Sequence, residues 1–364
     1  MKPLRLIADD LTGALDTAAQ FTGAGRAVPV FPGGLLPEAL PRDFAIDAAT
    51  REMDGPSAAA AAVRFARLLS TEPDVIAYKK VDSLLRGHPG LELAATLRTA
   101  PAAHCMIAPA FPLHGRVTRG GRQFSLAAGA SEPFGDDIRA TLVAQGIPVG
   151  LRSPGEDAPE GVSLWDAQTD EDLRLIAGAG ARLRPLPLWC GSGGLAAAIA
   201  NAVVPGAPRV GGPLLGLFGS DHPVTAVQLE RCAARLVSIA DGEADAGRVG
   251  ALLEDPGACL VRCALAGGMD RAEAALRISR EFGRLVARVP RPGTLLVSGG
   301  ETLRSLCQAL GTHRLDVVGQ LIPGVPVSRI VGGVWDGTLL VSKSGSFGDD
   351  ELLLRILAGQ ERGA

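Results

Sequence analysis

The sequence predicts an α/β fold with mainly parallel sheets, divided into two α/β domains. The chain has 364 residues, and at roughly 100–200 residues per domain this length indicates two or three domains. Hydrophobic residues make up 47% and charged residues 21% of the chain, a composition typical of a globular protein that buries a real core. Short apolar runs alternate with helical patterns throughout, which is the signature of parallel α/β architecture.

The N-terminal half opens with the pattern of strand, polar turn and helix. The run from Leu4 to Ala8 predicts a buried strand, and the turn Asp9-Asp10 precedes a helix that begins near Thr12. Further strands are expected over 27–31, 44–48, 74–79 and 105–108, and further helices over 57–70, 91–98 and 170–179.

A stretch rich in proline and glycine interrupts the periodicity near the middle of the chain. It indicates a linker over 204–213, between an N-terminal domain of residues 1–203 and a C-terminal domain of residues 214–364. In the second domain strands are expected over 214–218, 259–263, 294–297 and 338–341, and helices over 224–236, 271–287, 302–310 and 350–357. A ligand shared by the two domains is expected in a cleft between them, where the loops after the strands face each other.

Charge and composition argue against several classes of partner. The net charge is −3 and no block of Lys or Arg stands out, so we expect no nucleic-acid partner. Two aspartates appear within the first ten residues, and no run of about 18 apolar residues follows, which predicts a cytoplasmic protein without a membrane partner. The six cysteines form no CxxC pair, and this favours reduced, buried thiols over disulfides or a metal site at Cys259 and Cys263.

Two adjacent carboxylates follow the first strand. Asp9 and Asp10 stand at a helix start, and their side chains diverge. One is therefore expected to cap the helix while the other reaches a ligand hydroxyl group or a metal ion. The alternative is that both are capping and solvated loop residues.

The densest polar cluster extends from Tyr78 to His88, where an apolar strand ends. It contains Lys80, Asp82 and Arg86, a mixture that suits an anionic substrate whose hydroxyl group must be deprotonated. A solvated polar turn is the alternative. Only four lysines occur among the 36 basic residues, and two of them fall here. That clustering favours a functional role for the segment.

A third cluster, at 108–123, is cationic. Its arginines are Arg116, Arg119 and Arg122, and Gly120-Gly121 leaves backbone accessible between them. With Arg51 from the loop after the strand at 44–48, these arginines are expected to present a surface for carboxylate or phosphate. A surface ion pair is the alternative for each of them alone.

Three turns in the second half run from a strand through glycines into a helix. Such turns let backbone amides hold phosphate oxygens, and three of them in one domain favour a nucleotide site over plain tight turns. They are Gly219-Ser220-Asp221-His222, Ser298-Gly299-Gly300-Glu301-Thr302 and Lys343-Ser344-Gly345-Ser346-Phe347-Gly348.

Several common motifs are absent, and a combination of others resembles a known family. No Walker A loop, GxGxxG fingerprint, GxSxG or HExxH occurs. The chain resembles the four-carbon acid sugar kinase family, ATP-dependent kinases of threonate, erythronate and 3-oxo-tetronates. The segments that carry the resemblance are ADDLTGALD at 8–16, YKKVDSLLRGH at 78–88, APAFPLHGRVTRGG at 108–121, SGGET at 298–302, PGVP at 323–326 and KSGSFG at 343–348.

The resemblance implies an N-terminal domain that binds the sugar acid and a C-terminal domain that binds ATP. The substrate side then comprises Asp9, Asp10, Arg51, Lys80, Asp82 and Arg86, to which the cationic cluster adds Arg116. The nucleotide side comprises Ser220, Gly299, Gly300, Glu301, Thr302, Gly345 and Gly348, to which the last glycine turn adds Lys343.

Phosphoryl transfer to the terminal hydroxyl group of D-threonate, D-erythronate or a 3-oxo-tetronate is the expected reaction. Arg51 and Arg86 are hypothesised to hold the substrate carboxylate, Asp82 or Asp10 to orient or deprotonate the hydroxyl group, and Lys80 to balance charge. Mg²⁺ is expected with the nucleotide, not in a fixed protein site.

Two other functions are kept open: a sugar-acid lyase or isomerase, and a sensor that binds sugar acid and nucleotide without turnover. The oligomeric state is also open, with a homodimer among the possibilities.

Overall fold

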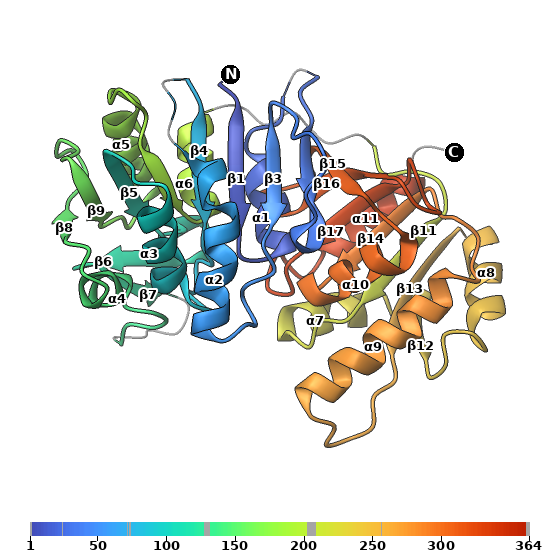
Figure 1. Ribbon diagram of the computed structural model, residues 1–364. Helices are drawn as coiled ribbons and strands as arrows, with labels where there is room; N and C mark the ends of the chain where they lie inside the picture. The colour runs from blue at the N-terminus through green and yellow to red at the C-terminus, as the bar shows by residue number, and fades with distance from the viewer. Residues whose placement is uncertain are drawn as a thin grey trace. The chain divides into compact units, whose positions relative to one another are not determined.

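The computed structural model describes residues 2–23, 25–70, 72, 74–126, 132–201, 209–255 and 257–361 (Figure 1). The chain divides into two compact units. The first comprises Met1–Phe21 and Val28–Val203, and the second comprises Thr22–Ala27 and Val204–Ala364.

The first unit is built around a parallel sheet with strand order β2-β3-β1-β4-β10-β5-β9-β8. The strands are β1 (Leu4–Ala8), β2 (Val28–Phe31), β3 (Phe44–Asp47), β4 (Ile76–Lys80), β5 (His104–Ala108), β8 (Val149–Arg152), β9 (Gly161–Trp165) and β10 (Leu188–Gly191). A separate antiparallel hairpin consists of β6 (Arg116–Arg119) and β7 (Arg122–Ser125). The mainly parallel α/β architecture predicted from the sequence is confirmed.

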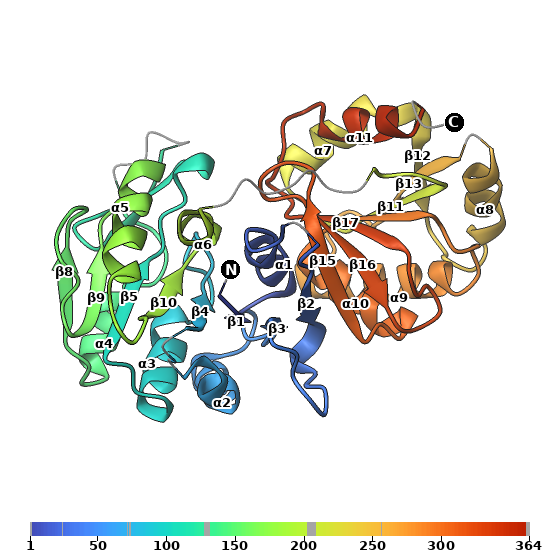
Figure 2. The ribbon, with the colours of Figure 1, turned by 90° about the horizontal axis from the view of Figure 1, so that it is seen from above.

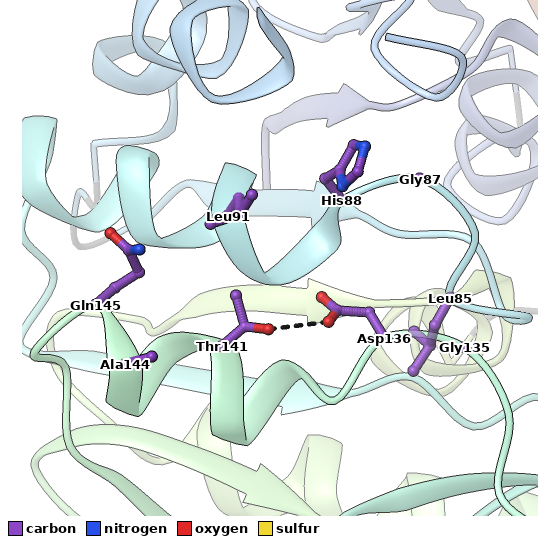
Figure 3. A pocket seen from close by; sticks show the side chains of 9 residues that line it. All are labelled: Leu85, Gly87, His88, Leu91, Gly135, Asp136, Thr141, Ala144 and Gln145. Carbon is purple, nitrogen blue, oxygen red and sulfur yellow. Dashed lines mark hydrogen bonds between the residues drawn. The ribbon is translucent and has the colours of Figure 1, made fainter. Parts of the chain in front are cut away.

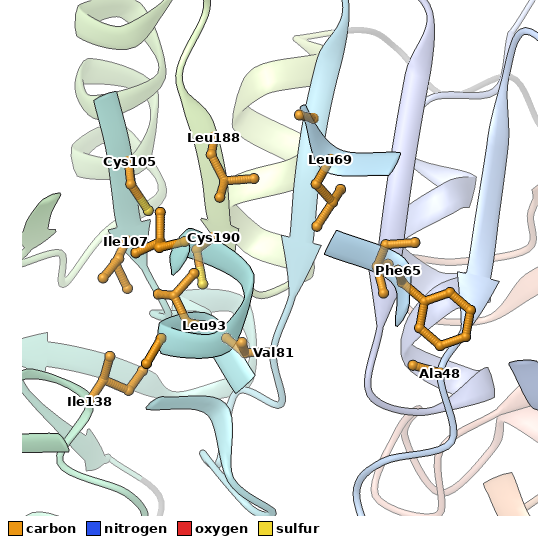
Figure 4. Packing of buried hydrophobic residues seen from close by; sticks show 14 of the residues in the cluster. Ala48, Phe65, Leu69, Val81, Leu93, Cys105, Ile107, Ile138, Leu188 and Cys190 are labelled. Atoms are coloured by element: carbon orange, nitrogen blue, oxygen red, sulfur yellow. The ribbon is translucent and has the colours of Figure 1, made fainter. Parts of the chain in front are cut away.

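Helices cover both faces of this sheet, α2, α3 and α4 on one and α1, α5 and α6 on the other (Figure 2). They are α1 (Leu11–Ala19), α2 (Gly55–Ala66), α3 (Pro89–Thr99), α4 (Ile138–Ala144), α5 (Asp170–Ala181) and α6 (Gly193–Ala200). On the α2–α4 face, Phe65 and Leu93 from the helices pack with Val81, Ile107 and Cys190 in one apolar cluster (Figure 4). Alternate strand residues face opposite sides of a sheet, so adjacent residues of β4 face different helices.

The central strand β10 and helix α6 are absent from the elements expected from the sequence. Leu188–Gly191 is only a four-residue apolar run, and Ser192-Gly193-Gly194 behind it is a strand-to-helix turn like those predicted in the second half. The Ser192 hydroxyl accepts from the Gly194 N–H at 3.1 Å and so caps α6.

The second unit contains a sheet with strand order β12-β13-β11-β14-β17-β16-β15. Its strands are β11 (Leu214–Phe218), β12 (Leu236–Ile239), β13 (Ala258–Cys263), β14 (Thr294–Ser298), β15 (Arg314–Gln320), β16 (Pro326–Val331) and β17 (Leu339–Lys343). The pairs that join β12, β13, β11, β14 and β17 are parallel, and β16 pairs antiparallel with both β17 and β15.

Helices also cover both faces of the second sheet, with α7 and α11 on one face and α9 and α10 on the other (Figure 2). The helices are α7 (Pro223–Arg231), α8 (Ala246–Glu254), α9 (Arg271–Val286), α10 (Gly300–Leu310) and α11 (Leu352–Glu361). The parallel strands β11, β14 and β17 all end at the same edge, where the three glycine turns lie.

The predicted linker, 204–213, is described only from residue 209 onwards, and 204–208 lie outside the described residues. Its described part packs onto the second unit, because the Thr294 N–H donates to the Pro213 carbonyl oxygen at 3.1 Å. All six cysteines are buried and unbridged. Among the described residues, no helix combines the length and the apolar character that a membrane crossing requires.

Candidate functional site

Charged side chains gather at the carboxyl edge of the first sheet. β1 lies between β3 and β4, and Ala8 at its end pairs with Asp47 on one side and Lys80 on the other. The loops after these three strands therefore emerge side by side. They bring together the predicted residues Asp9, Asp10, Arg51, Lys80, Asp82 and Arg86.

Asp10 caps α1 and is held by Arg51. Its Oδ1 accepts from the Gly13 N–H at 2.9 Å, as an N-cap side chain does. The guanidinium of Arg51 donates from Nε to Asp9 Oδ2 at 2.8 Å and from Nη2 to Asp10 Oδ1 at 2.8 Å. Arg51 therefore spans both carboxylates of the first turn, and its rigid fork fixes their relative position.

Asp82 is enclosed by two arginines. Arg86 donates from Nε to its Oδ2 at 2.6 Å and from Nη2 to its Oδ1 at 3.1 Å, and Arg51 Nη2 lies 3.9 Å from Oδ1. Although burial opposes it, the charge of Arg51 and the bonds from Arg86 hold the pKa of Asp82 well below its usual range. Asp10 also has a lowered pKa, because the charges of Arg51 and Lys80 outweigh its burial.

Two cations of this edge have no such carboxylate partner within the described ranges. Lys80 is 5% exposed, and its Nζ lies 2.8 Å from the point where a Cβ on Gly13 would stand. Arg116 donates from Nη1 to the Ser83 hydroxyl at 2.6 Å and makes no ion pair with the described residues. Burial lowers the pKa of Arg116, which indicates a guanidinium partly stripped of water and ready to pair with an anion.

Lys79 and Lys80 are adjacent but face opposite sides of the sheet. Lys79 is buried on the α3 side, where its Nζ lies 2.6 Å from Glu92 Oε2. The same Glu92 oxygen accepts from the Thr50 hydroxyl at 3.0 Å. Lys79 therefore belongs to a buried support under the loop that carries Arg51, and only Lys80 reaches the charged edge.

The other two arginines of the cationic cluster point away from this edge. Arg119 bonds Gln168 at 2.7 Å, and Arg122 forms a 2.7 Å ion pair with Asp137. The Gly120 and Gly121 amides donate to the Asp166 carboxylate at 2.7 and 2.8 Å. The segment is a hairpin whose polar groups pair within the first unit, and Arg116 alone of the three arginines faces Ser83.

Asp16 is a buried carboxylate on α1 that the sequence analysis did not single out as a candidate. It lies one turn beyond Gly13 on the same face of α1 and is 6% exposed. Its Oδ1 is buried without a hydrogen-bond partner among the described residues. Burial raises the pKa of Asp16 to about 6, against the opposing charge of Lys80. The available signal was a single carboxylate within the otherwise uncharged helix sequence LTGALDTAA.

A cavity of about 560 Å³ lies beside this edge, between α3 and α4 (Figure 3). Two of its polar lining residues pair with each other, because Asp136 accepts from the Thr141 hydroxyl at 2.9 Å. Asp136 also accepts from the Gly90 N–H at 2.9 Å. The lining contains Leu85 and Gly87, which flank Arg86, but none of the predicted site residues.

In the second unit the three glycine turns meet at the ends of β11, β14 and β17. A Cβ on Gly219 would overlap Thr302 Oγ1, and a Cβ on Gly345 would overlap Ser220 Oγ. Gly299 has φ +112°, a conformation that side chains rarely adopt, and it stands directly before α10. The turns therefore approach each other as closely as backbone allows, with the amides that begin α10 beside them.

The buried side chain of Lys343 donates hydrogen bonds to residues in and beside these turns. It is 1% exposed, and its Nζ donates to Thr225 Oγ1 at 3.1 Å, Ser298 Oγ at 3.4 Å and the Ser344 carbonyl oxygen at 3.2 Å. In the described part of the chain it forms no ion pair, and burial lowers its pKa to about 8. A buried ammonium among neutral oxygens fits a site that receives an anion.

The other residues predicted to bind the nucleotide also belong to these turns, but the surroundings of Glu301 and Gly348 differ from those of the rest. Glu301 is exposed in the first turn of α10. Gly348 has φ +85°, and a Cβ there would meet Leu352 and Gln228. Its lack of a side chain therefore allows the chain to turn into α11. In the described ranges, no three His, Cys, Asp or Glu side chains are grouped to hold a metal ion.

Comparison with known proteins adds two kinds of similarity. A family model described as a sugar-binding N-terminal domain matches residues 4–141, and one described as a nucleotide-binding C-terminal domain matches residues 215–353. The D-threonate kinase of Bordetella bronchiseptica is 30% identical over 390 residues, covering 96% of this chain and 95% of the relative.

The D-threonate kinase of Cupriavidus necator is 31% identical over 409 residues, with the same coverage of 96% and 95%. A crystal structure of a Salmonella typhimurium LT2 protein matches with a TM-score of 0.73 at 22% identity, covering 98% of both chains. The family models and the two kinases bear on the family of the chain, and the crystal structure bears on its fold.

Proposed function

The chain belongs to the four-carbon acid sugar kinase family, and from this premise we propose that it transfers the γ-phosphate of ATP to the terminal hydroxyl group of a four-carbon sugar acid. D-Threonate is the first candidate substrate, because two relatives at 30% and 31% identity over nearly their whole length are D-threonate kinases. D-Erythronate and the 3-oxo-tetronates are the competing candidates.

The observation that carries the proposal is the pairing of charges at the edge of the first sheet. Arg51 and Arg86 are engaged by aspartates, so the cations left for a substrate are Lys80 and Arg116. We assign the substrate carboxylate to Arg116, with the exposed side of Arg86 as a second donor. A planar guanidinium matches a carboxylate. Arg116, unlike Arg86, makes no ion pair with the described residues, so its charge is available to the substrate.

Lys80 and the two arginine-held aspartates then act on the hydroxyl groups and the transferred phosphoryl group. Asp10 and Asp82 accept hydrogen bonds from substrate hydroxyl groups and orient them, a role that suits ionised carboxylates with lowered pKa values. Lys80 offsets the negative charge that develops on the transferred phosphoryl group. Phosphoryl transfer depends mainly on such positioning and charge stabilisation.

The nucleotide is assigned to the glycine turns of the second unit. The amides at the start of α10 and the backbone near Ser220 and Gly345 would hold phosphate oxygens, and Lys343 would supply the positive charge beneath them. Mg²⁺, bound with the nucleotide, would neutralise phosphate charge. This chain's own part is to bind and orient the two substrates.

Measuring ADP release at saturating Mg-ATP tests the proposal against both alternatives. The panel is D-threonate, D-erythronate, L-threonate and 3-oxo-tetronates, and we expect D-threonate to give the highest kcat/KM. A lyase or isomerase would consume a sugar acid without ATP, and a sensor would bind the acid in a thermal-shift assay without ADP release. If no acid stimulates ADP formation while binding persists, the kinase proposal is wrong.

A further inference from the structure

Helix α1 of the first unit carries a buried carboxylate oxygen that accepts no hydrogen bond from the described residues. Asp16 is 6% exposed, and its Oδ1 has no partner in the described part of the chain. Buried polar atoms are nearly always hydrogen-bonded, because an unpaired one loses its hydration without compensation. Such an atom is a place where a bound molecule can supply the missing hydrogen bond.

The surroundings of Asp16 connect it to Lys80. Gly13 and Asp16 are three residues apart on α1 and so are neighbours on its surface. Lys80 Nζ lies against Gly13, 2.8 Å from where a Cβ would stand. On its other side, Asp16 Oδ2 lies 2.6 Å from the corresponding Cβ position of Gly193, the first residue of α6. The charges that act on Asp16 are those of Lys80, Asp10 and Arg116, and the start of α6 lies against its Oδ2.

The other aspartates of this edge are less suited to take up a proton. Asp82 accepts from Arg86 through both oxygens, and Asp10 accepts from Arg51, Thr12 and the Gly13 amide. Their pKa values are lowered, so they would hold a proton weakly near neutral pH.

Asp9 is also buried, its Oδ1 likewise lacks a hydrogen-bond partner among the described residues, and its pKa is raised. Asp9 differs from Asp16 because its other oxygen is part of the clamp on Arg51. Its Oδ2 accepts from Arg51 Nε at 2.8 Å, and its carbonyl oxygen accepts from the Thr50 and Arg51 amides at 3.0 and 3.2 Å. Asp16 has no such anchor, and its raised pKa of about 6 suits reversible protonation near neutral pH.

We propose that Asp16 is the general base, a catalytic residue that accepts the proton of the substrate hydroxyl group. This inference rests on the proposed kinase function. In the step, the hydroxyl oxygen forms a bond to the γ-phosphorus, and the bond from that phosphorus to the β,γ-bridging oxygen breaks. The bridging oxygen keeps the electron pair and leaves on ADP, while the hydroxyl proton moves to the Asp16 carboxylate. Lys80, beside it, remains charged next to the transferred group.

The test is Asp16→Asn in the full-length enzyme, with the exposed Asp170→Asn on α5 as a matched control. We expect kcat for D-threonate to fall about 100-fold or more, while the KM for D-threonate and the Kd for ADP change less than about threefold. The kcat/KM of the wild-type enzyme, which reports ionisations of the enzyme before D-threonate binds, should decline below about pH 6, and the residual kcat/KM of Asp16→Asn should lack this decline. Asp170→Asn should match the wild-type enzyme.

Several results overturn the inference. They are an Asp16→Asn variant whose kcat stays within about threefold of wild type, a variant that retains the acid decline, and a wild-type profile that is flat through about pH 6. The last needs no variant and so holds even if Asp16→Asn fails to fold. A wild-type enzyme that turns over with an unchanged Asp16→Asn rate refutes this inference alone, whereas an inactive wild-type enzyme refutes the proposed function and the inference together.

Discussion

Raising the pH from about 7 to about 9 should weaken nucleotide binding about tenfold, because Lys343 loses its proton over this range. Burial lowers the pKa of this lysine from 10.5 to about 8. The shift corresponds to about 3 kcal/mol of cost for holding the charge in the free protein. A phosphate placed above the ammonium group would offset that cost and raise the pKa again, so the complex binds a proton that the free protein has begun to lose.

The direction and the size of the change in nucleotide affinity follow from this difference in the pKa of Lys343 between the free and the bound protein. Below about pH 7 Lys343 is charged in both the free and the bound protein, and affinity does not depend on pH. At about pH 9 roughly one free molecule in ten carries the charge, so binding must first recover a proton and loses about 1.4 kcal/mol. The Thr225 and Ser298 hydroxyl groups and the Ser344 and Gly345 carbonyl groups that face Nζ do not titrate in this range.

Isothermal titration calorimetry with ADP at constant Mg²⁺ measures the effect directly. Titrations in two buffers of different ionisation enthalpy should show uptake of about half a proton at about pH 8. The phosphates of ADP contribute little there, since the second pKa of a phosphate group is near 6. Lys343→Met should bind more weakly and lose the dependence on pH. Constant affinity from pH 7 to 9, or the same decline in Lys343→Met, would refute the reasoning.

Three substitutions test other parts of the site. Arg51→Lys should raise the KM for D-threonate at least about tenfold in the ADP-release assay, because one ammonium cannot replace a fork that spans two aspartates; an unchanged KM would contradict this role. Lys80→Arg should lower kcat about tenfold or more, since a guanidinium does not fit against Gly13; normal turnover would show that charge alone suffices. Gly345→Ala should weaken ADP binding at least about tenfold by displacing a neighbouring turn, whereas Gly247→Ala, which has nothing within 4 Å of its new Cβ, should not; equal affinities would refute the close approach.

Much of the candidate site was predictable because it follows strand ends. Asp10 and Lys80 stand at the ends of neighbouring parallel strands, and a strand followed by polar residues marks the edge where ligands bind. The resemblance placed Arg51 in the same group, and the structure brings all three together. Strand periodicity also separates Lys79 from Lys80, since adjacent residues face opposite sides of a sheet.

The remainder depends on partners far away in the chain. Arg122 was expected to face an anion, but its charge is taken by Asp137, and the amide of Gly121 is taken by Asp166, 45 residues later. The chain sequence does not show which arginine keeps its charge, because that depends on which carboxylates fold beside it. The same holds for Asp16, whose significance arises from burial and from the loss of hydrogen-bond partners.

The central claim, phosphoryl transfer to a sugar acid, is tested most directly by ³¹P NMR of D-threonate incubated with Mg-ATP and the purified protein. The account predicts a new phosphomonoester resonance coupled to the protons of the terminal CH₂ group, growing in step with ADP. ATP consumption that yields only inorganic phosphate, or a complete absence of ATP consumption with any acid of the panel, would contradict it.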